Sequence, residues 1–278
     1  CLLTCQKTVE AGLTTVHWII ESPTEIRIMQ KLIANKKLPI RVYIMIPVEF
    51  MEDLTELGLQ TGFGDNMTRI GSIKILTDGS LGARTAALAE PYNDEPKTKG
   101  MTLYTQEELN RLVREAHDAN FQLAIHAIGD QAVDMTLTAI EKALAKGPRK
   151  NLRHRIEHAS VLNKKQIDRM KKLNLIASIQ PHFIISDFWV IDRLGPKRAR
   201  WTYAFKTLMK KGILATGSSD CPVEPISPIL GIYAAVARKE NQEERITVNE
   251  ALRMYTINAA FASFEENIKG SIEAGKLA

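Results

Sequence analysis

The sequence predicts an α/β protein built as a (β/α)8 TIM-like barrel, for which the seven strands that can be counted are one short. Seven short apolar runs alternate with amphipathic segments of helical period along the 278 residues. Strands that read as continuous apolar runs are buried on both faces, which points to a parallel sheet covered by helices. Polar residues end several of the runs, and this favours a barrel, whose functional groups come from many strand ends. No Gly-x-Gly-x-x-Gly motif follows the first run, so a dinucleotide-binding sheet is disfavoured.

The predicted strands are residues 14–18, 40–46, 70–77, 121–127, 152–159, 175–180 and 212–217. The predicted helices are residues 105–120, 130–146 and 164–173, each with apolar residues at three- and four-residue spacing. Thr105 followed by Glu108 is the signature of a capping box. Two long connections, residues 78–102 and 181–200, are predicted to be loops, and such loops commonly form lids or substrate walls.

Length and composition indicate one domain over residues 1–278 with 45% hydrophobic and 25% charged residues. The net charge is +5, but the basic residues are spread along helices without interleaved aromatics, so we expect no nucleic-acid partner. No apolar run approaches the roughly 20 residues that span a bilayer, so we expect no membrane partner. Three cysteines cannot form a disulfide framework, and no signal peptide is recognisable. We therefore expect a cytoplasmic protein.

Four residues with metal-ligand chemistry lie at or near the ends of predicted strands: Lys74, His126, His158 and Asp220. Each has an ordinary interpretation by itself, such as a hydrogen-bonded core histidine, a snorkelling lysine or a helix N-cap. Buried charged groups are costly unless they are paired or bind a metal, so four unrelated explanations are less economical than one shared cation. Because imidazole and carboxylate suit zinc, iron or manganese, we expect a divalent metal, with zinc first among these.

Motifs around these residues extend over nearly the whole chain. They are Ala-Gly-Leu-Thr-Thr-Val-His (11–17), Lys-Ile-Leu-Thr-Asp-Gly-Ser-Leu-Gly-Ala-Arg-Thr (74–85), His-Ala-Ile-Gly-Asp (126–130), His-Arg-Ile-Glu-His (154–158), Gln-Pro-His (180–182), Gly-Ser-Ser-Asp-Cys-Pro (217–222) and Gly-Ser-Ile-Glu-Ala-Gly-Lys-Leu-Ala (270–278). In this order they resemble the amidohydrolase superfamily, in particular its amidohydrolase-3 branch of YtcJ-like and N-substituted formamide deformylase-like proteins.

The resemblance implies a role for each residue. Lys74 would be carbamylated and bridge two metals, and His126 and His158 would bind one of them. Asp220 would bind the other metal and act as the catalytic base on a water molecule whose pKa the metal lowers.

The substrate would be a small molecule with an amide-type bond. Candidates for contacting it are Asp78, Arg84, His182 and Trp189, although a salt bridge for Asp78 and Arg84 or loop packing for Trp189 explains these residues equally well.

The chain also departs from the family pattern. Family members carry a His-x-His pair on the first barrel strand, whereas His17 stands alone in a segment that matches the second strand. We therefore expect strands two to eight without the first strand and without the family's β-sandwich, in a chain truncated at both ends. Metal binding and hydrolysis should then be impaired. The exposed edges of an open barrel should also favour homo-oligomers.

Three functions follow from these observations. The leading one is metal-dependent hydrolysis of a carbon–nitrogen bond in an amide, formamide or cyclic amide. The alternative is a catalytically silent barrel that serves as a scaffold or binding protein. A third, a barrel aldolase that uses Lys74 as a Schiff-base amine, leaves both histidines and Asp220 unexplained.

Overall fold

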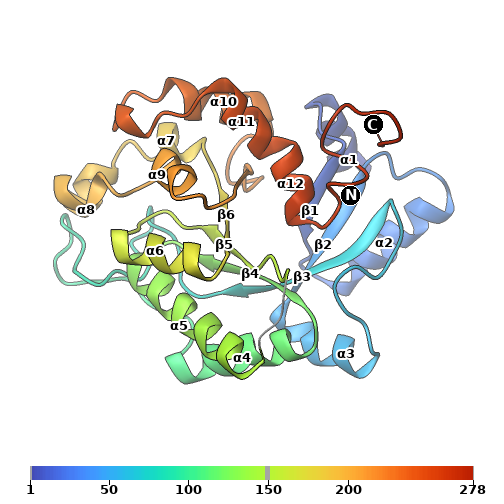
Figure 1. The fold of residues 1–278 in the computed structure, drawn as a ribbon, viewed down its shortest axis with the longest axis horizontal. Helices are drawn as coiled ribbons and strands as arrows, with labels where there is room; N and C mark the ends of the chain where they lie inside the picture. Colours follow the sequence, from blue (N-terminus) through green and yellow to red (C-terminus); the bar gives the residue numbers. More distant parts are fainter. Residues whose placement is uncertain (1, 148–150, 278) are drawn as a thin grey trace.

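The computed structural model describes residues 2–147 and 151–277, and within them a seven-stranded sheet forms the centre of the protein (Figure 1). All paired strands are parallel, and spatial neighbours are consecutive in the chain, from β1 at one edge to β7 at the other. The strands are β1 (Thr15–Ile19), β2 (Arg41–Pro47), β3 (Thr68–Leu76), β4 (Gln122–Ala127), β5 (Arg155–His158), β6 (Ile176–Ile179) and β7 (Ala215–Gly217). The sheet curls into an open half-barrel, which confirms the predicted fold class.

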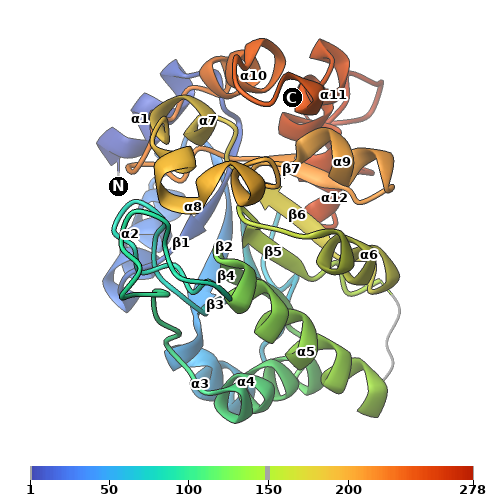
Figure 2. The same ribbon diagram turned by 90° about the vertical axis from the view of Figure 1, so that its left-hand side faces the viewer.

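Helices connect the strands and cover the outer side of the sheet, where Figures 1 and 2 show α3, α4, α5 and α6. The helices are α1 (Leu2–Glu10), α2 (Pro23–Ala34), α3 (Met51–Glu56), α4 (Gln106–Asp118), α5 (Asp130–Lys146), α6 (Lys164–Lys172), α7 (Phe183–Ser186), α8 (Val190–Ala199), α9 (Phe205–Lys210), α10 (Pro228–Ala237), α11 (Val248–Tyr255) and α12 (Ile257–Ala262), with short 3-10 turns η1 (Val48–Phe50) and η2 (Gln242–Glu244).

Local sequence signals account for the start of α4 and for the burial of β4. The Thr105 hydroxyl accepts from the Glu108 amide at 3.3 Å, and the Glu108 carboxylate accepts from the Thr105 amide at 2.8 Å, so the predicted capping box is confirmed. In β4, Leu123 and Ile125 are fully buried and share one hydrophobic core with Leu109 of α4. The continuous apolar pattern therefore corresponds to a strand covered on both faces.

The prediction for the connection 181–200 was wrong, because this segment contains α7 and α8. Gly195 and Pro196 interrupt the helical pattern in the sequence and made it read as a loop. In the structure, Gly195 adopts φ 70° and joins two short helical stretches across a kink. Residues 78–102 contain neither a helix nor a strand, as predicted.

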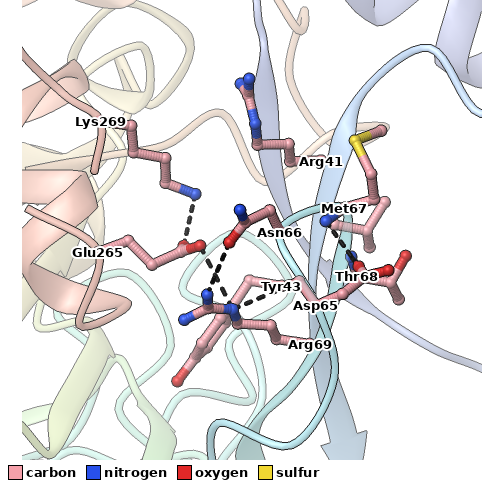
Figure 3. Close-up of a pocket in the computed structure, with 10 residues that line it drawn as sticks. Arg41, Tyr43, Asp65, Asn66, Met67, Thr68, Arg69, Glu265 and Lys269 are labelled. Atoms are coloured by element: carbon pink, nitrogen blue, oxygen red, sulfur yellow. Dashed lines mark hydrogen bonds and ion pairs between the residues drawn. The ribbon is translucent and has the colours of Figure 1, made fainter. Parts of the chain in front are cut away.

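The segment after α12 packs against the amino-terminal ends of the strands, where Figure 3 shows Glu265 and Lys269 beside Arg69. The buried Glu265 carboxylate lies between Arg69, at 3.8 Å, and Lys269, with which it also forms an ion pair. Arg153 donates to both oxygens of Glu266, at 2.9 and 2.7 Å. The pocket around Glu265 is too small for a water molecule, so this end of the sheet is a packed base.

No helix in the described ranges is long and apolar enough to cross a bilayer. Cys5 is buried and Cys221 is exposed, and both are free thiols, whereas Cys1 lies outside the described residues.

Candidate metal centre

His126 and His158 meet at the carboxyl ends of two adjacent strands. His126 is the penultimate residue of β4, and His158 is the last residue of β5. Their imidazole centroids are 4.4 Å apart, and the ring planes make an angle of 71°. The predicted meeting of these two side chains is therefore observed.

The backbone of His158 explains how its ring reaches His126. Glu157 is the register partner of His126, so simple alternation along β5 would turn the next side chain to the opposite face. His158 instead adopts φ 73°, in the left-handed region that costs free energy for a non-glycine residue. This conformation ends the strand and accompanies the close approach of the two rings.

His158 is prepared to act as a neutral ligand. Its side chain is only 5% exposed, and burial lowers its pKa well below the ordinary value, assisted by the charges of His126 and Lys74. Its Nδ1 atom is buried without a hydrogen-bond partner among the described residues. Burying an imidazole nitrogen without a hydrogen-bond partner is unusual and costs free energy, and a bound cation would give this nitrogen a partner.

His126 is oriented by an outer hydrogen bond. Its Nε2 lies 3.0 Å from the carbonyl oxygen of Gly79, which can only accept, so Nε2 carries the proton. In its neutral form, which a metal ligand requires, the ring presents Nδ1 as its lone-pair nitrogen. Metal-binding histidines typically donate their other N–H to a carbonyl or carboxylate in this manner.

Lys74 faces the same region from β3, two residues before the strand ends. It is 6% exposed, and burial lowers the pKa of its amine. The negative charges of Glu157 and Asp220 partly oppose this shift, whereas Arg155 adds to it. A desolvated lysine of this kind is more readily neutral, as a ligand or a carbamate precursor requires.

Asp220 lies in the turn that follows β7 and has φ 58°. Burial raises the pKa of its carboxyl group, while the positive charges of Lys74 and His126 oppose the rise. Asp220 is therefore within electrostatic range of Lys74 and His126. The described residues nevertheless contain no group of three His, Cys, Asp or Glu side chains placed as metal ligands, so Asp220 does not complete such a cluster with His126 and His158.

The concave face of the sheet also carries a buried ion pair that the sequence did not reveal. Arg155 Nε lies 2.7 Å from the Glu157 carboxylate, and Arg155 Nη1 donates to His17 Nδ1 at 2.6 Å. Burial lowers the pKa of His17 well below its ordinary value, and Arg155 adds to this shift. His17 is thus a neutral acceptor engaged by Arg155.

The four candidates for substrate contact have different surroundings. The buried Asp78 carboxylate accepts backbone amides from Ile128, Gly129 and Ala87 at 3.0, 2.8 and 2.9 Å, which favours an anchoring role. Arg84 forms an ion pair with Asp94 at 2.9 Å, which agrees with the salt-bridge interpretation of this residue.

Trp189 and His182 complete the set. Trp189 packs on a small apolar cluster, with the Arg193 guanidinium 5.0 Å from its ring centroid. His182 contacts Glu224 through Nδ1. Contact with substrate stays a prediction for all four.

Sequence reasoning also missed Asp187, in the connection wrongly predicted as a loop. The Tyr203 hydroxyl donates to its carboxylate. Burial raises the pKa of Asp187 to about 6, the charge of Glu224 contributes, and the hydrogen bond from Tyr203 opposes the shift.

We expect Asp187→Asn to remove a pH dependence of stability. A carboxyl group with a raised pKa in the folded state stabilises the protein below its unfolded pKa of about 4, and this contribution is lost as pH rises through about 6. Relative to the variant, the wild type should lose up to about 3 kcal/mol of unfolding free energy between pH 4 and pH 7. Urea denaturation of both proteins at the two pH values measures this change. If the difference in unfolding free energy between wild type and variant were the same at pH 4 and pH 7, the prediction would be contradicted.

Comparisons with known proteins agree with this geometry. The sequence profile of the amidohydrolase family matches residues 4–278. The chain is 41% identical over 257 residues to YtcJ of Bacillus subtilis (strain 168), an amidohydrolase by name, covering 88% of this chain and 47% of that protein. It is 31% identical over 221 residues to N-substituted formamide deformylase of Arthrobacter pascens, covering 76% of this chain and 40% of that enzyme.

A crystal structure of an uncharacterised metal-dependent hydrolase from Pyrococcus furiosus superposes with a TM-score of 0.91 and 35% sequence identity, covering 100% of this chain and 57% of that one. The chain spans less than half the length of the two curated relatives. The profile match over nearly every residue, joined to the half-barrel and its paired histidines, shows that the chain belongs to the amidohydrolase family.

Proposed function

We propose that this chain is the barrel part of a metal-dependent hydrolase that cleaves a carbon–nitrogen bond in an amide, formamide or cyclic amide. The observation that carries the proposal is the approach of the His126 and His158 rings to 4.4 Å at adjacent strand ends. Family membership and the names of the two curated relatives support the reaction class.

The residues present fit a divalent cation in part. His158 offers a buried nitrogen without a partner, and His126 is held by the Gly79 carbonyl as an outer-sphere acceptor. Lys74, as the amine or its carbamate, is the third candidate ligand. Two imidazoles and a nitrogen or oxygen donor suit zinc. A bound cation would supply Lewis acidity, which polarises a carbonyl and makes water more acidic.

Asp220 is proposed as the residue that moves the proton. Its carboxylate would accept a proton from the attacking water and pass it to the leaving nitrogen. The fields of Lys74 and His126 favour its ionised form, which a base requires, against the opposing effect of burial. Glu157, paired with Arg155, adds negative charge close to Lys74.

We further propose that this chain holds no more than one cation and has low hydrolase activity. His17 is the histidine that could serve as a further ligand, but its Nδ1 accepts a hydrogen bond from Arg155. The absence of a three-ligand cluster among the described His, Cys, Asp and Glu side chains also favours the alternative of a catalytically silent scaffold.

Metal analysis tests these proposals. The protein is reconstituted with Zn²⁺, desalted and analysed for bound metal, and hydrolysis of an N-substituted formamide is followed in parallel. One equivalent or less with slow hydrolysis is expected. Two tightly held equivalents would contradict the single-cation proposal, and no binding and no hydrolysis would favour the scaffold.

Self-association through the edges of β1 and β7 is also proposed, because parallel strands at open edges leave backbone groups available for pairing. Sedimentation velocity tests it, and a strictly monomeric profile would contradict it.

A further inference from the structure

A second polar pair, His182 and Glu224, lies beside the candidate metal centre. His182 follows the end of β6, and Glu224 follows Asp220 by four residues. Nδ1 of His182 is in hydrogen-bond contact with Oε2 of Glu224. The Glu224 side chain is 9% exposed, whereas the His182 side chain is 17% exposed, so the carboxylate is more buried than the ring it contacts.

The local structure ties this pair to the centre. Gln180, in the same turn as His182, donates to the Ser218 hydroxyl at 2.8 Å, which links the end of β6 to the end of β7. Phe183, the next residue after His182, has its ring 6.4 Å from the His158 ring. The charge of Glu224 also raises the pKa of Asp220. The turn that carries His182 therefore lies beside His158, and Glu224 is within electrostatic range of Asp220.

The chemistry of the contact fixes the position of a proton. An ionised carboxylate can only accept hydrogen bonds, so the hydrogen lies on Nδ1 of His182. In the neutral ring, Nε2 is then a hydrogen-bond acceptor. An imidazole free in solution has no such constraint, and a buried carboxylate is a strong means of selecting one tautomer.

We propose that Glu224 is a positioning residue that holds the proton on His182 Nδ1, so that Nε2 accepts a hydrogen bond from an N–H group of the substrate. This inference rests on the proposed function and narrows its substrate class to primary or secondary amides, formamides and cyclic amides that keep an N–H. A tertiary amide lacks the donor and leaves Nε2 without a partner, which is how a polar site rejects an analogue.

The tautomer is measured by ¹⁵N NMR of histidine-labelled protein at alkaline pH, with the His182→Gln spectrum to assign the resonances among the six histidines. We expect the proton on Nδ1 in the wild type. Glu224→Gln keeps an acceptor oxygen and should preserve this tautomer, whereas Glu224→Leu should move the proton to Nε2. A wild-type ring protonated on Nε2, or one unaffected by Glu224→Leu, would overturn the inference.

Recognition of the N–H group is tested with the same labelled protein and two probes, N-benzylformamide and N-benzyl-N-methylformamide. The Nε2 resonance should shift with the first probe only. Equal shifts with both, or none with either, would overturn the recognition step. Hydrolysis of N-benzylformamide by the zinc-treated protein is scored separately, so hydrolysis without an Nε2 shift would reject this inference and leave the proposed function standing. A shift with N-benzylformamide alone, without hydrolysis, would support this inference and contradict the proposed hydrolase function.

Discussion

Replacing Asp78 with alanine is expected to lower the free energy of unfolding by roughly 3–5 kcal/mol. The carboxylate accepts three backbone amides, and one of its oxygens serves both Ala87 and Gly129. Removing it leaves these donors buried without partners, and each such group costs about 1–3 kcal/mol. The loss should be smaller than the simple sum because water can enter the space.

Urea denaturation monitored by circular dichroism measures this change. The matched control is Asp53→Ala, which removes an exposed carboxylate from α3 and should change stability by no more than about 0.5 kcal/mol. If both variants had the same stability as the wild type, the anchoring role of Asp78 would be rejected, and its assignment to substrate contact would regain support.

Replacing His158 with asparagine is expected to reduce Zn²⁺ affinity by more than the roughly 10- to 100-fold that loss of an outer-sphere partner causes. The reason is direct: His158 supplies the buried nitrogen that lacks a partner in the protein itself. Asparagine retains polarity but not the imidazole nitrogen. Competition with a chromogenic chelator measures the affinity.

His117→Asn is the matched control, because His117 is also a buried histidine but lies on α4, where its Nε2 contacts the Gly147 carbonyl at 2.6 Å. Its Zn²⁺ affinity should equal that of the wild type. Equal losses in both variants would indicate a general effect on the fold instead of a ligand role for His158.

The sequence predicted the elements that depend on local pattern. The apolar run of β4 and the capping box at Thr105 contain enough information within a few residues to define a strand and a helix start. The prediction for the connection 181–200 was wrong because Gly195 and Pro196 oppose a helix locally. Packing of Leu194 and Trp189 in the small apolar cluster outweighs this local preference.

The sequence predicted only the part of the candidate site that depends on where the strands end. His126 and His158 meet because parallel strands end at a common edge, which the pattern indicated. The anchoring of Asp78, the pairing of Arg155 with His17 and the contact of His182 with Glu224 join residues 9 to 138 positions apart. No local signal specifies such contacts, because they depend on side-chain directions in the folded chain.

Anomalous diffraction at the zinc edge from crystals grown with Zn²⁺ tests the central claim most directly. The predicted result is a single peak about 2.0–2.1 Å from one nitrogen of His126 and one of His158. A peak bound elsewhere, or an empty map with the two rings turned apart, would contradict the assignment of these histidines as the metal ligands.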